Sequence, residues 1–221
     1  MFYERHNEED NELVGLNDYN PNHIDLRNLE ERLRYPLSDD DIELYLGKRV
    51  NIINFSELKK YKHIDDLLPT NLSYVIILIE QEKDKGHWVT ILKYGNTVEY
   101  FNSYGFKPNY EMKFFNKLFG QNKNDLTRLL SNNNYDVIYN SFKFQDIKNP
   151  NSNACGRHII CRIIAMKNLQ QSLPEYIAMM KKLQKKYSEA LGKNLLAYSE
   201  AIGERKRSNH LKYDLLVSLL I

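Results

Sequence analysis

The feature that most constrains the fold of this 221-residue chain is a change of hydrophobic period near its middle. Residues 74–80, YVIILIE, form a short β-rich run without polar alternation, which predicts a central strand buried on both faces. Two more strand patterns follow at 87–94 and 97–101, joined by the tight turn Gly95-Asn96. We therefore expect an antiparallel meander in the middle of the chain.

Helical patterns lie on both sides of this meander. They are expected at 22–34, 39–46, 55–68, 155–169, 175–191 and 211–221. One or two further short strands are expected at 136–139 and 142–145. This order predicts an α+β fold, with a central and mostly antiparallel sheet flanked by helices.

Charge divides the chain more clearly than its formal net charge of +2 suggests. Residues 1–46 contain 13 acidic and 4 basic residues, a net −9, which leaves +11 for residues 47–221. A basic body of this kind can bind nucleic acid or another anionic partner. The alternative is a solvated surface that the acidic segment of the same chain neutralises in part.

We divide the chain into an acidic N-terminal arm with a short helix (1–34), a core (35–170) and a basic helical extension packed on the core (171–221). The extension contains Lys181, Lys182, Lys185 and Lys186. A solvated helix face is the simpler interpretation of these lysines, and a DNA-binding patch is the alternative.

Composition excludes several classes of protein. The chain is 42% hydrophobic and 27% charged, as ordinary globular proteins are. Its two cysteines cannot build a disulfide framework, which favours a reducing compartment. No apolar run approaches the ~20 residues of a membrane helix, and the first residues lack the pattern of a secretory signal. We therefore expect a protein that is neither secreted nor embedded in a membrane.

Cys155 is predicted to begin a helix directly after a polar loop. A thiol at a helix N-terminus lies at the positive end of the macrodipole, which lowers its pKa and favours the thiolate. Gly156 leaves room for a substrate near the backbone, where N–H groups can stabilise an oxyanion. The alternative for Cys155 is a small buried apolar residue, as we expect for Cys161.

Two polar residues flank neighbouring strands of the meander. His87 opens one strand and Asn102 follows the next, and adjacent strands lie ~4.8 Å apart. The Asn oxygen can then hold an imidazole N–H and fix the tautomer, although Asn102 could also serve only the turn that it starts. Gln145 is an amide donor upstream of the thiol and suits an oxyanion hole, with Asn151 or Asn153 as alternatives.

Cys155, His158 and Cys161 also form the pattern C-x2-H-x2-C. Three residues spaced by three along a helix do not all lie on one face, and the sequence offers no fourth metal ligand nearby. We therefore predict no metal and no other cofactor at this site.

The order His, Asn, Gln, Cys resembles the adenain and ubiquitin-like-protease superfamily of cysteine peptidases. That superfamily has His, an acidic or amide residue, Gln and Cys in this order. The segments that carry the resemblance are HW at 87–88, YFNSYGF at 100–106 and PNSNACG at 150–156. The last of these is very close to the nucleophile loop of the adenoviral protease. The resemblance covers roughly residues 35–170.

The resemblance implies a papain-related fold with Cys155 as nucleophile, His87 as general base, Asn102 as orienting residue and Gln145 as oxyanion donor. It also implies that Trp88 helps to wall a narrow channel, beside Gly156, for a cleavage sequence of small residues. Asn102 stands where the family usually has an acidic residue, and the ten-residue interval from Gln145 to Cys155 is longer than usual.

The function expected from this resemblance is an endopeptidase that cleaves viral capsid or core precursors after small, Gly-type residues during virion maturation. We expect a monomer in the virion and in the host cytoplasm, with those precursors as substrates. DNA is a possible further partner, because the adenoviral relative uses it as a cofactor. The alternatives are a protease that removes ubiquitin-like or SUMO-like conjugates, and a catalytically weak structural virion protein.

Overall fold

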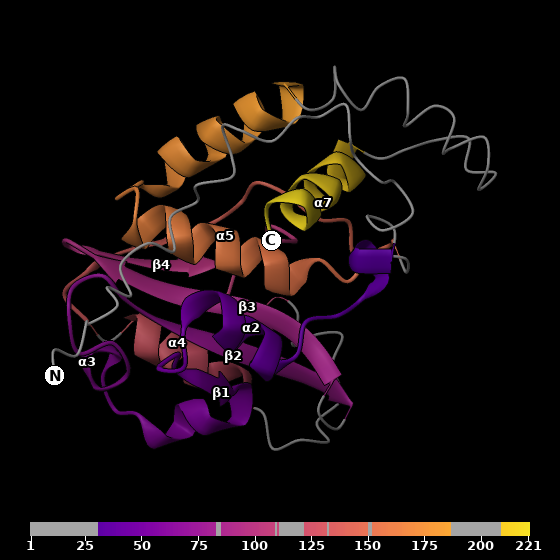
Figure 1. Cartoon of the computed structure of the whole chain (residues 1–221). Helices are drawn as coiled ribbons and strands as arrows, with labels where there is room; N and C mark the ends of the chain where they lie inside the picture. Colours follow the sequence, from indigo (N-terminus) through magenta and orange to yellow (C-terminus); the bar gives the residue numbers. More distant parts are fainter. Residues whose placement is uncertain are drawn as a thin grey trace, which may run out of the picture.

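The chain folds around a five-stranded mixed sheet with helices on both faces (Figure 1), which confirms the expected α+β class. The computed structural model describes residues 31–82, 85–108, 110, 122–131, 133–149, 152–186 and 209–221. The strands are β1 (Ile52–Asn54), β2 (Ser73–Glu82), β3 (Lys85–Tyr94), β4 (Thr97–Phe101) and β5 (Asp136–Tyr139). They lie side by side in the order of the sequence.

The pairing of the two edge strands corrects the expectation of a mostly antiparallel sheet. β2, β3 and β4 form the predicted antiparallel meander, whereas β1 pairs with β2 and β5 pairs with β4 in parallel. Parallel neighbours need a crossover connection. The 3₁₀ helix η2 (Phe55–Lys60) and α3 (Ile64–Leu67) supply one, and the other contains α4 (Lys123–Ser131).

Of the one or two strands expected at 136–139 and 142–145, the first forms as β5, whereas residues 142–145 form a loop. After β5, the amide of Asn140 still donates to the carbonyl of Tyr100. The amides of Phe144 and Gln145 then both donate to the single carbonyl of Ser103, at 2.9 Å each. Two donors on one acceptor end the regular ladder, and they hold this loop beside the end of β4.

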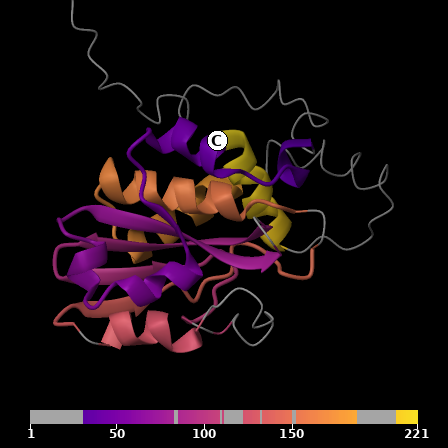
Figure 2. The same ribbon diagram turned by 90° about the horizontal axis from the view of Figure 1, so that it is seen from below.

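Both faces of β2 are buried, which confirms the prediction for its apolar run. Val75, Ile77 and Ile79 belong to one hydrophobic cluster, and Ile76 and Leu78 belong to the other. η2, α3 and α4 cover the first face. α5 (Cys155–Lys167), α7 (Asn209–Leu220) and the helical residues 173–186 contribute to the cluster on the second face. Figure 2 shows α4 and α5 on opposite sides of the sheet.

The helix predicted after Ser38 is confirmed as α2 (Asp39–Leu46), which begins with a reciprocal cap. The Ser38 hydroxyl accepts from the Asp41 amide at 3.2 Å, and the Asp41 carboxylate accepts from the Ser38 amide at 2.8 Å. The helix expected at 55–68 is divided between η2 and α3. Expectations for residues 1–30 and 187–208 lie outside the described residues.

A buried ion pair holds α5 against the sheet. Arg162 of α5 donates from Nε and Nη2 to the two carboxylate oxygens of Glu99 on β4, at 2.8 and 2.7 Å, and both side chains are fully buried. The Tyr94 hydroxyl donates to the same carboxylate at 2.6 Å. Bidentate geometry and full hydrogen bonding compensate the cost of burying both charges. The pair therefore fixes where α5, and the thiol at its start, lies relative to β4.

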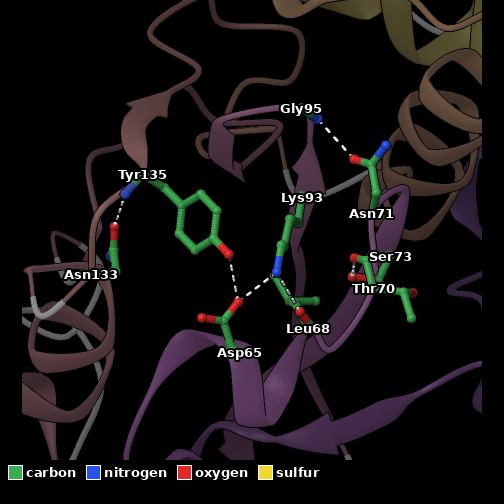
Figure 3. Close-up of polar contacts among 9 residues, drawn as sticks. All are labelled: Asp65, Leu68, Thr70, Asn71, Ser73, Lys93, Gly95, Asn133 and Tyr135. Carbon is green, nitrogen blue, oxygen red and sulfur yellow. Dashed lines mark hydrogen bonds and ion pairs between the residues drawn. The ribbon is translucent and has the colours of Figure 1, made fainter.

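A second polar cluster lies at the other end of β3, six residues beyond His87, which is ~20 Å along a strand. The Lys93 ammonium donates to Asp65 at 2.5 Å and lies 4.7 Å from the ring centre of Tyr135, whose hydroxyl also donates to Asp65 (Figure 3). These bonds, Lys93 first and Tyr135 second, hold the pKa of Asp65 below its usual value. The cluster clamps α3, β3 and the segment before β5 together.

Candidate active site

Cys155 is the first residue of α5, which packs on β3 (Figure 1). Its side chain is partly exposed, whereas the other described thiol, Cys161, is buried. Ala154, the residue at the N-cap position, makes no side-chain cap. The amides of the first turn are therefore not capped by that side chain, and they stand at the positive end of the helix dipole.

The two thiols differ in acidity for physical reasons. Burial acts to raise the pKa of Cys155, but the neighbouring His87 imidazole, with the backbone amides of Trp88 and Gly156, outweighs it and holds this pKa below the ordinary thiol value. Burial raises the pKa of Cys161 to about 12. Cys155 is thus the more readily ionised thiol, and Cys161 is chemically inert.

His87 and Asn102 meet as the strand pattern predicts. The imidazole Nε2 lies 3.1 Å from Asn102 Oδ1, and the His87 and Asn102 side chains are 2% and 0% exposed. With the Nε2 hydrogen donated to Asn102, Nδ1 is the nitrogen that can exchange a proton with the Cys155 thiol. The structure therefore brings Cys155, His87 and Asn102 together in one constellation.

Glycine is needed directly before His87. A Cβ atom on Gly86 would lie 2.1 Å from the carbonyl oxygen of Ile79 on the neighbouring strand, closer than any real contact. Residues 80 and 86 are partners in the ladder, next to a register shift between residues 80 and 82. Gly86 thus permits the close strand approach from which His87 projects.

Asn102 is held by its own turn as well as by the imidazole. Its Oδ1 also accepts from the Tyr104 amide at 2.9 Å, and its backbone carbonyl accepts from the Gly105 amide and from the Asn140 side chain, both at 2.8 Å. Asn102 therefore makes the contacts of its turn and the contact with the imidazole at the same time. The Tyr104 ring stacks on the His87 ring with centroids 4.2 Å apart. This stacking and the hydrogen bond to Asn102 together restrict the orientation of the imidazole ring.

Gln145 is buried between two loops. Its Oε1 accepts from the Ser103 hydroxyl at 2.9 Å, and its Nε2 donates to the carbonyl of Ser152 at 3.1 Å. Ser152 belongs to the α5 entry loop (residues 152–154), which leads directly to Cys155. The alternative donor Asn153 is exposed, and its Nδ2 donates to the carbonyl of Arg34 at 2.6 Å. Asn151 lies outside the described residues.

Trp88 and Gly156 pack against the chain itself. The Trp88 side chain is buried, and its indole N–H donates to the Leu37 carbonyl at 2.9 Å. A Cβ atom on Gly156 would lie 3.0 Å from Leu37 Cβ, so the absence of a side chain there lets Leu37 approach the start of α5. Both residues therefore pack on Leu37 beside the start of α5.

Residues 33–37, which we call the N-terminal strap, cross the start of α5 through their backbone carbonyls. The Asn153 amide donates to Leu33 at 2.9 Å, and the Arg157 guanidinium donates to Tyr35 at 2.9 Å. Together with the Asn153 side chain on Arg34, these bonds tie the α5 entry loop to a segment more than a hundred residues earlier. The strap thereby limits the freedom of the backbone around the thiol.

Sequence reasoning missed several residues that complete this site, namely Ser103, Tyr104, Ser152 and Asp214. Asp214 on α7 accepts from the Ser152 hydroxyl and pairs with His158 Nε2, both at 2.8 Å. One signal was available: Asp214 is the only acidic residue of the apolar stretch 211–221. An isolated acid in an apolar helix must find buried partners.

Metal sites and membrane-spanning helices have characteristic geometries with which the described residues can be compared. Among them, no group of three or more His, Cys, Asp or Glu side chains is placed to hold a metal ion. His158, from the C-x2-H-x2-C pattern, pairs with Asp214 instead. Within the same ranges, every helix is too short or too polar to cross a bilayer.

Comparison with known proteins gives a viral relative. No family model matches the chain. The chain is 31% identical, over 144 residues, to the uncharacterized protein V9 of Sputnik virophage. The aligned part is 63% of this chain and 81% of the V9 protein. This similarity indicates a viral origin.

Proposed function

We propose that the chain, which belongs to one protein family with protein V9 of Sputnik virophage, is a viral cysteine endopeptidase. Its proposed role is to cleave capsid or core precursors after small, Gly-type residues during virion maturation. The observation that carries the proposal is the partly exposed Cys155 thiol at a helix start, with its pKa lowered by a His87 imidazole that Asn102 holds. The choice of substrate rests on the viral relative and on the resemblance to the adenain superfamily.

In the first step of the proposed reaction, the Cys155 thiolate attacks the scissile carbonyl carbon. The C–S bond forms while the carbonyl π electrons move onto oxygen. The oxyanion accepts hydrogen bonds from the Gln145 amide and from backbone amides at the start of α5. The His87 imidazolium gives its Nδ1 proton to the leaving nitrogen as the C–N bond breaks, which releases the first product and leaves a thioester.

In the second step, water resolves the thioester. His87, now neutral, accepts a proton from water as the water oxygen attacks the thioester carbon. The C–S bond breaks, the thiolate returns to Cys155 and the second product leaves as a carboxylic acid. The bond from Nε2 to Asn102 holds the imidazole in the tautomer that both steps need.

The proposal is tested by exposing a peptide library prepared from a denatured proteome to the purified full chain and to its Cys155→Ser variant. We expect new peptide ends after small residues with the unaltered chain and none with the variant. Urea unfolding of both proteins controls for folding, because the change of sulfur to oxygen is nearly isosteric. The same cleavages in the Cys155→Ser sample would overturn the proposal.

Vinyl-sulfone derivatives of ubiquitin and SUMO separate this proposal from deconjugation. These probes carry an electrophile at the C-terminus of the folded modifier, so a deconjugating enzyme forms a covalent adduct. We expect no adduct at Cys155 under conditions in which the peptide library is cleaved. Stoichiometric capture at Cys155 would move the substrate class to ubiquitin-like conjugates.

A further inference from the structure

The C-terminal helix places a carboxylate in the core next to the α5 entry loop. Asp214 is fully buried on α7, between the apolar side chains of Tyr213, Leu216 and Val217 in the sequence. A buried carboxylate is costly unless it accepts several hydrogen bonds. Asp214 Oδ2 accepts from the Ser152 hydroxyl and Oδ1 pairs with His158 Nε2, each at 2.8 Å.

Ser152 connects this carboxylate to Gln145. The Ser152 hydroxyl donates to Asp214, and the carbonyl of the same residue accepts from Gln145 Nε2 at 3.1 Å. The other end of the Gln145 amide is fixed by the Ser103 hydroxyl at 2.9 Å. Ser103 directly follows Asn102, so three hydrogen bonds and the short covalent links between them connect α7 to the residue that holds His87.

Fixing both ends of the Gln145 amide sets the direction of its donors. An amide nitrogen has two hydrogens, and one of them points at the Ser152 carbonyl. Within the part of the chain that the structure describes, the second hydrogen has no protein acceptor, although the Gln145 side chain is 1% exposed. An amide donor that is held in a fixed direction meets one requirement of an oxyanion hole.

We propose that Asp214 is a positioning residue for Gln145, acting through Ser152, so that α7 is part of the catalytic unit. This inference rests on the proposed peptidase function. Asp214 touches neither substrate nor thiol; it holds the loop whose carbonyl orients the oxyanion donor. The helical C-terminal extension, which the sequence resemblance does not cover, thereby acquires a role in catalysis.

A purely structural role makes a different prediction. If Asp214 only anchored α7 through His158, then a change that spares this pair would leave turnover intact. Ser152→Ala is such a change, because it deletes the hydroxyl and keeps both the Ser152 carbonyl and the contact between His158 and Asp214. Ser218→Ala is the matched control, since it removes another buried hydroxyl, which donates to the backbone carbonyl of Asp214 on the same helix.

The experiment measures kcat, KM and thiol alkylation for the full chain and its Ser152→Ala, Asp214→Asn and Ser218→Ala variants, with a peptide taken from the library cleavages. We expect Ser152→Ala and Asp214→Asn each to lower kcat about tenfold with KM little changed, less than the ~10²–10³-fold loss for deleting an oxyanion donor. The double variant should be no slower than the slower single one. Alkylation at Cys155 should not change, because it needs no oxyanion hole.

Unchanged kcat in Ser152→Ala, additive losses in the double variant, or an equal loss in Ser218→Ala would overturn the inference. Hydrogen exchange separates this failure from failure of the proposed function. Even in a chain without peptidase activity, Ser152→Ala should speed exchange at the amides of Gln145 and Asn153, which bond to Ser103 and Leu33. Exchange as slow as in the unaltered chain would refute the contact series itself.

Discussion

Replacing Asn102 by Ala removes the acceptor that holds the His87 imidazole. Asn102 Oδ1 accepts from His87 Nε2 at 3.1 Å and from the Tyr104 amide at 2.9 Å, and it is fully buried. A hydrogen bond to a charged group contributes about 1.5–3 kcal/mol. This contribution is lost from the ion pair of imidazolium and thiolate, and one pKa unit corresponds to about 1.4 kcal/mol. The pKa of the Cys155 thiol should therefore rise by about one to two units.

The assay is the rate of Cys155 alkylation by iodoacetamide between pH 5 and 9, followed by mass spectrometry, which needs no substrate. The thiolate is the reactive species, so a lowered pKa keeps alkylation fast at pH 6 and a raised pKa slows it. We expect Asn102→Ala to react at least tenfold more slowly than the unaltered chain at pH 6. The alkylation rates of the two proteins should converge above pH 9, where Cys155 is ionised in both.

Asn102→Asp is the matched control, because it keeps the acceptor oxygen and adds a negative charge. That charge stabilises the imidazolium, so reactivity at pH 6 should be retained and the imidazolium should persist to higher pH. An alkylation profile of Asn102→Ala that overlays the unaltered profile, in a protein that unfolds at a similar urea concentration, would refute the reasoning that Asn102 supports the ion pair.

Three further predictions concern stability and selectivity. Gly156→Ala should lower the free energy of unfolding in urea by about 1–3 kcal/mol, because its Cβ would lie 3.0 Å from Leu37 Cβ. Leu37→Gly removes that Cβ, so Gly156→Ala should cost much less in this background; an equal loss in both backgrounds would contradict the packing argument. Glu99→Gln should lower the free energy of unfolding in urea by about 3–5 kcal/mol, because it leaves the buried charge of Arg162 without an opposite charge. A loss below 1 kcal/mol would contradict the argument from the buried ion pair. Cys161 should resist iodoacetamide at pH 7 until the chain is denatured, because its pKa is about 12; mass spectrometry that finds it modified in the native protein would refute this.

The meander and the thiol site are the parts of the molecule that the sequence predicts well. An apolar run at 74–80 and a tight turn at Gly95 determine strand order locally, and strand order brings His87 next to Asn102. The helix that starts at Cys155 is likewise visible in the sequence. These features depend on neighbours in sequence or on the adjacent strand, so local patterns suffice.

The parts that escape sequence reasoning depend on contacts between distant segments. The packing of Trp88 and Gly156 against Leu37, far earlier in the chain, has no local signature in the sequence. The contact between Ser152 and Asp214 spans 62 residues and depends on where α7 docks. The parallel pairing of both edge strands depends on crossover helices. The edge strands have only three and four residues, and a pattern this short does not indicate in which direction a strand pairs.

Processing of the viral capsid tests the central claim most directly. The capsid precursor of the same virus is produced together with either the unaltered chain or its Cys155→Ser variant, and intact masses of the capsid proteins are measured. We predict that the precursor is shortened after a small residue only when Cys155 is present, and that it stays full-length with the variant. Identical capsid masses in the two samples would contradict the account.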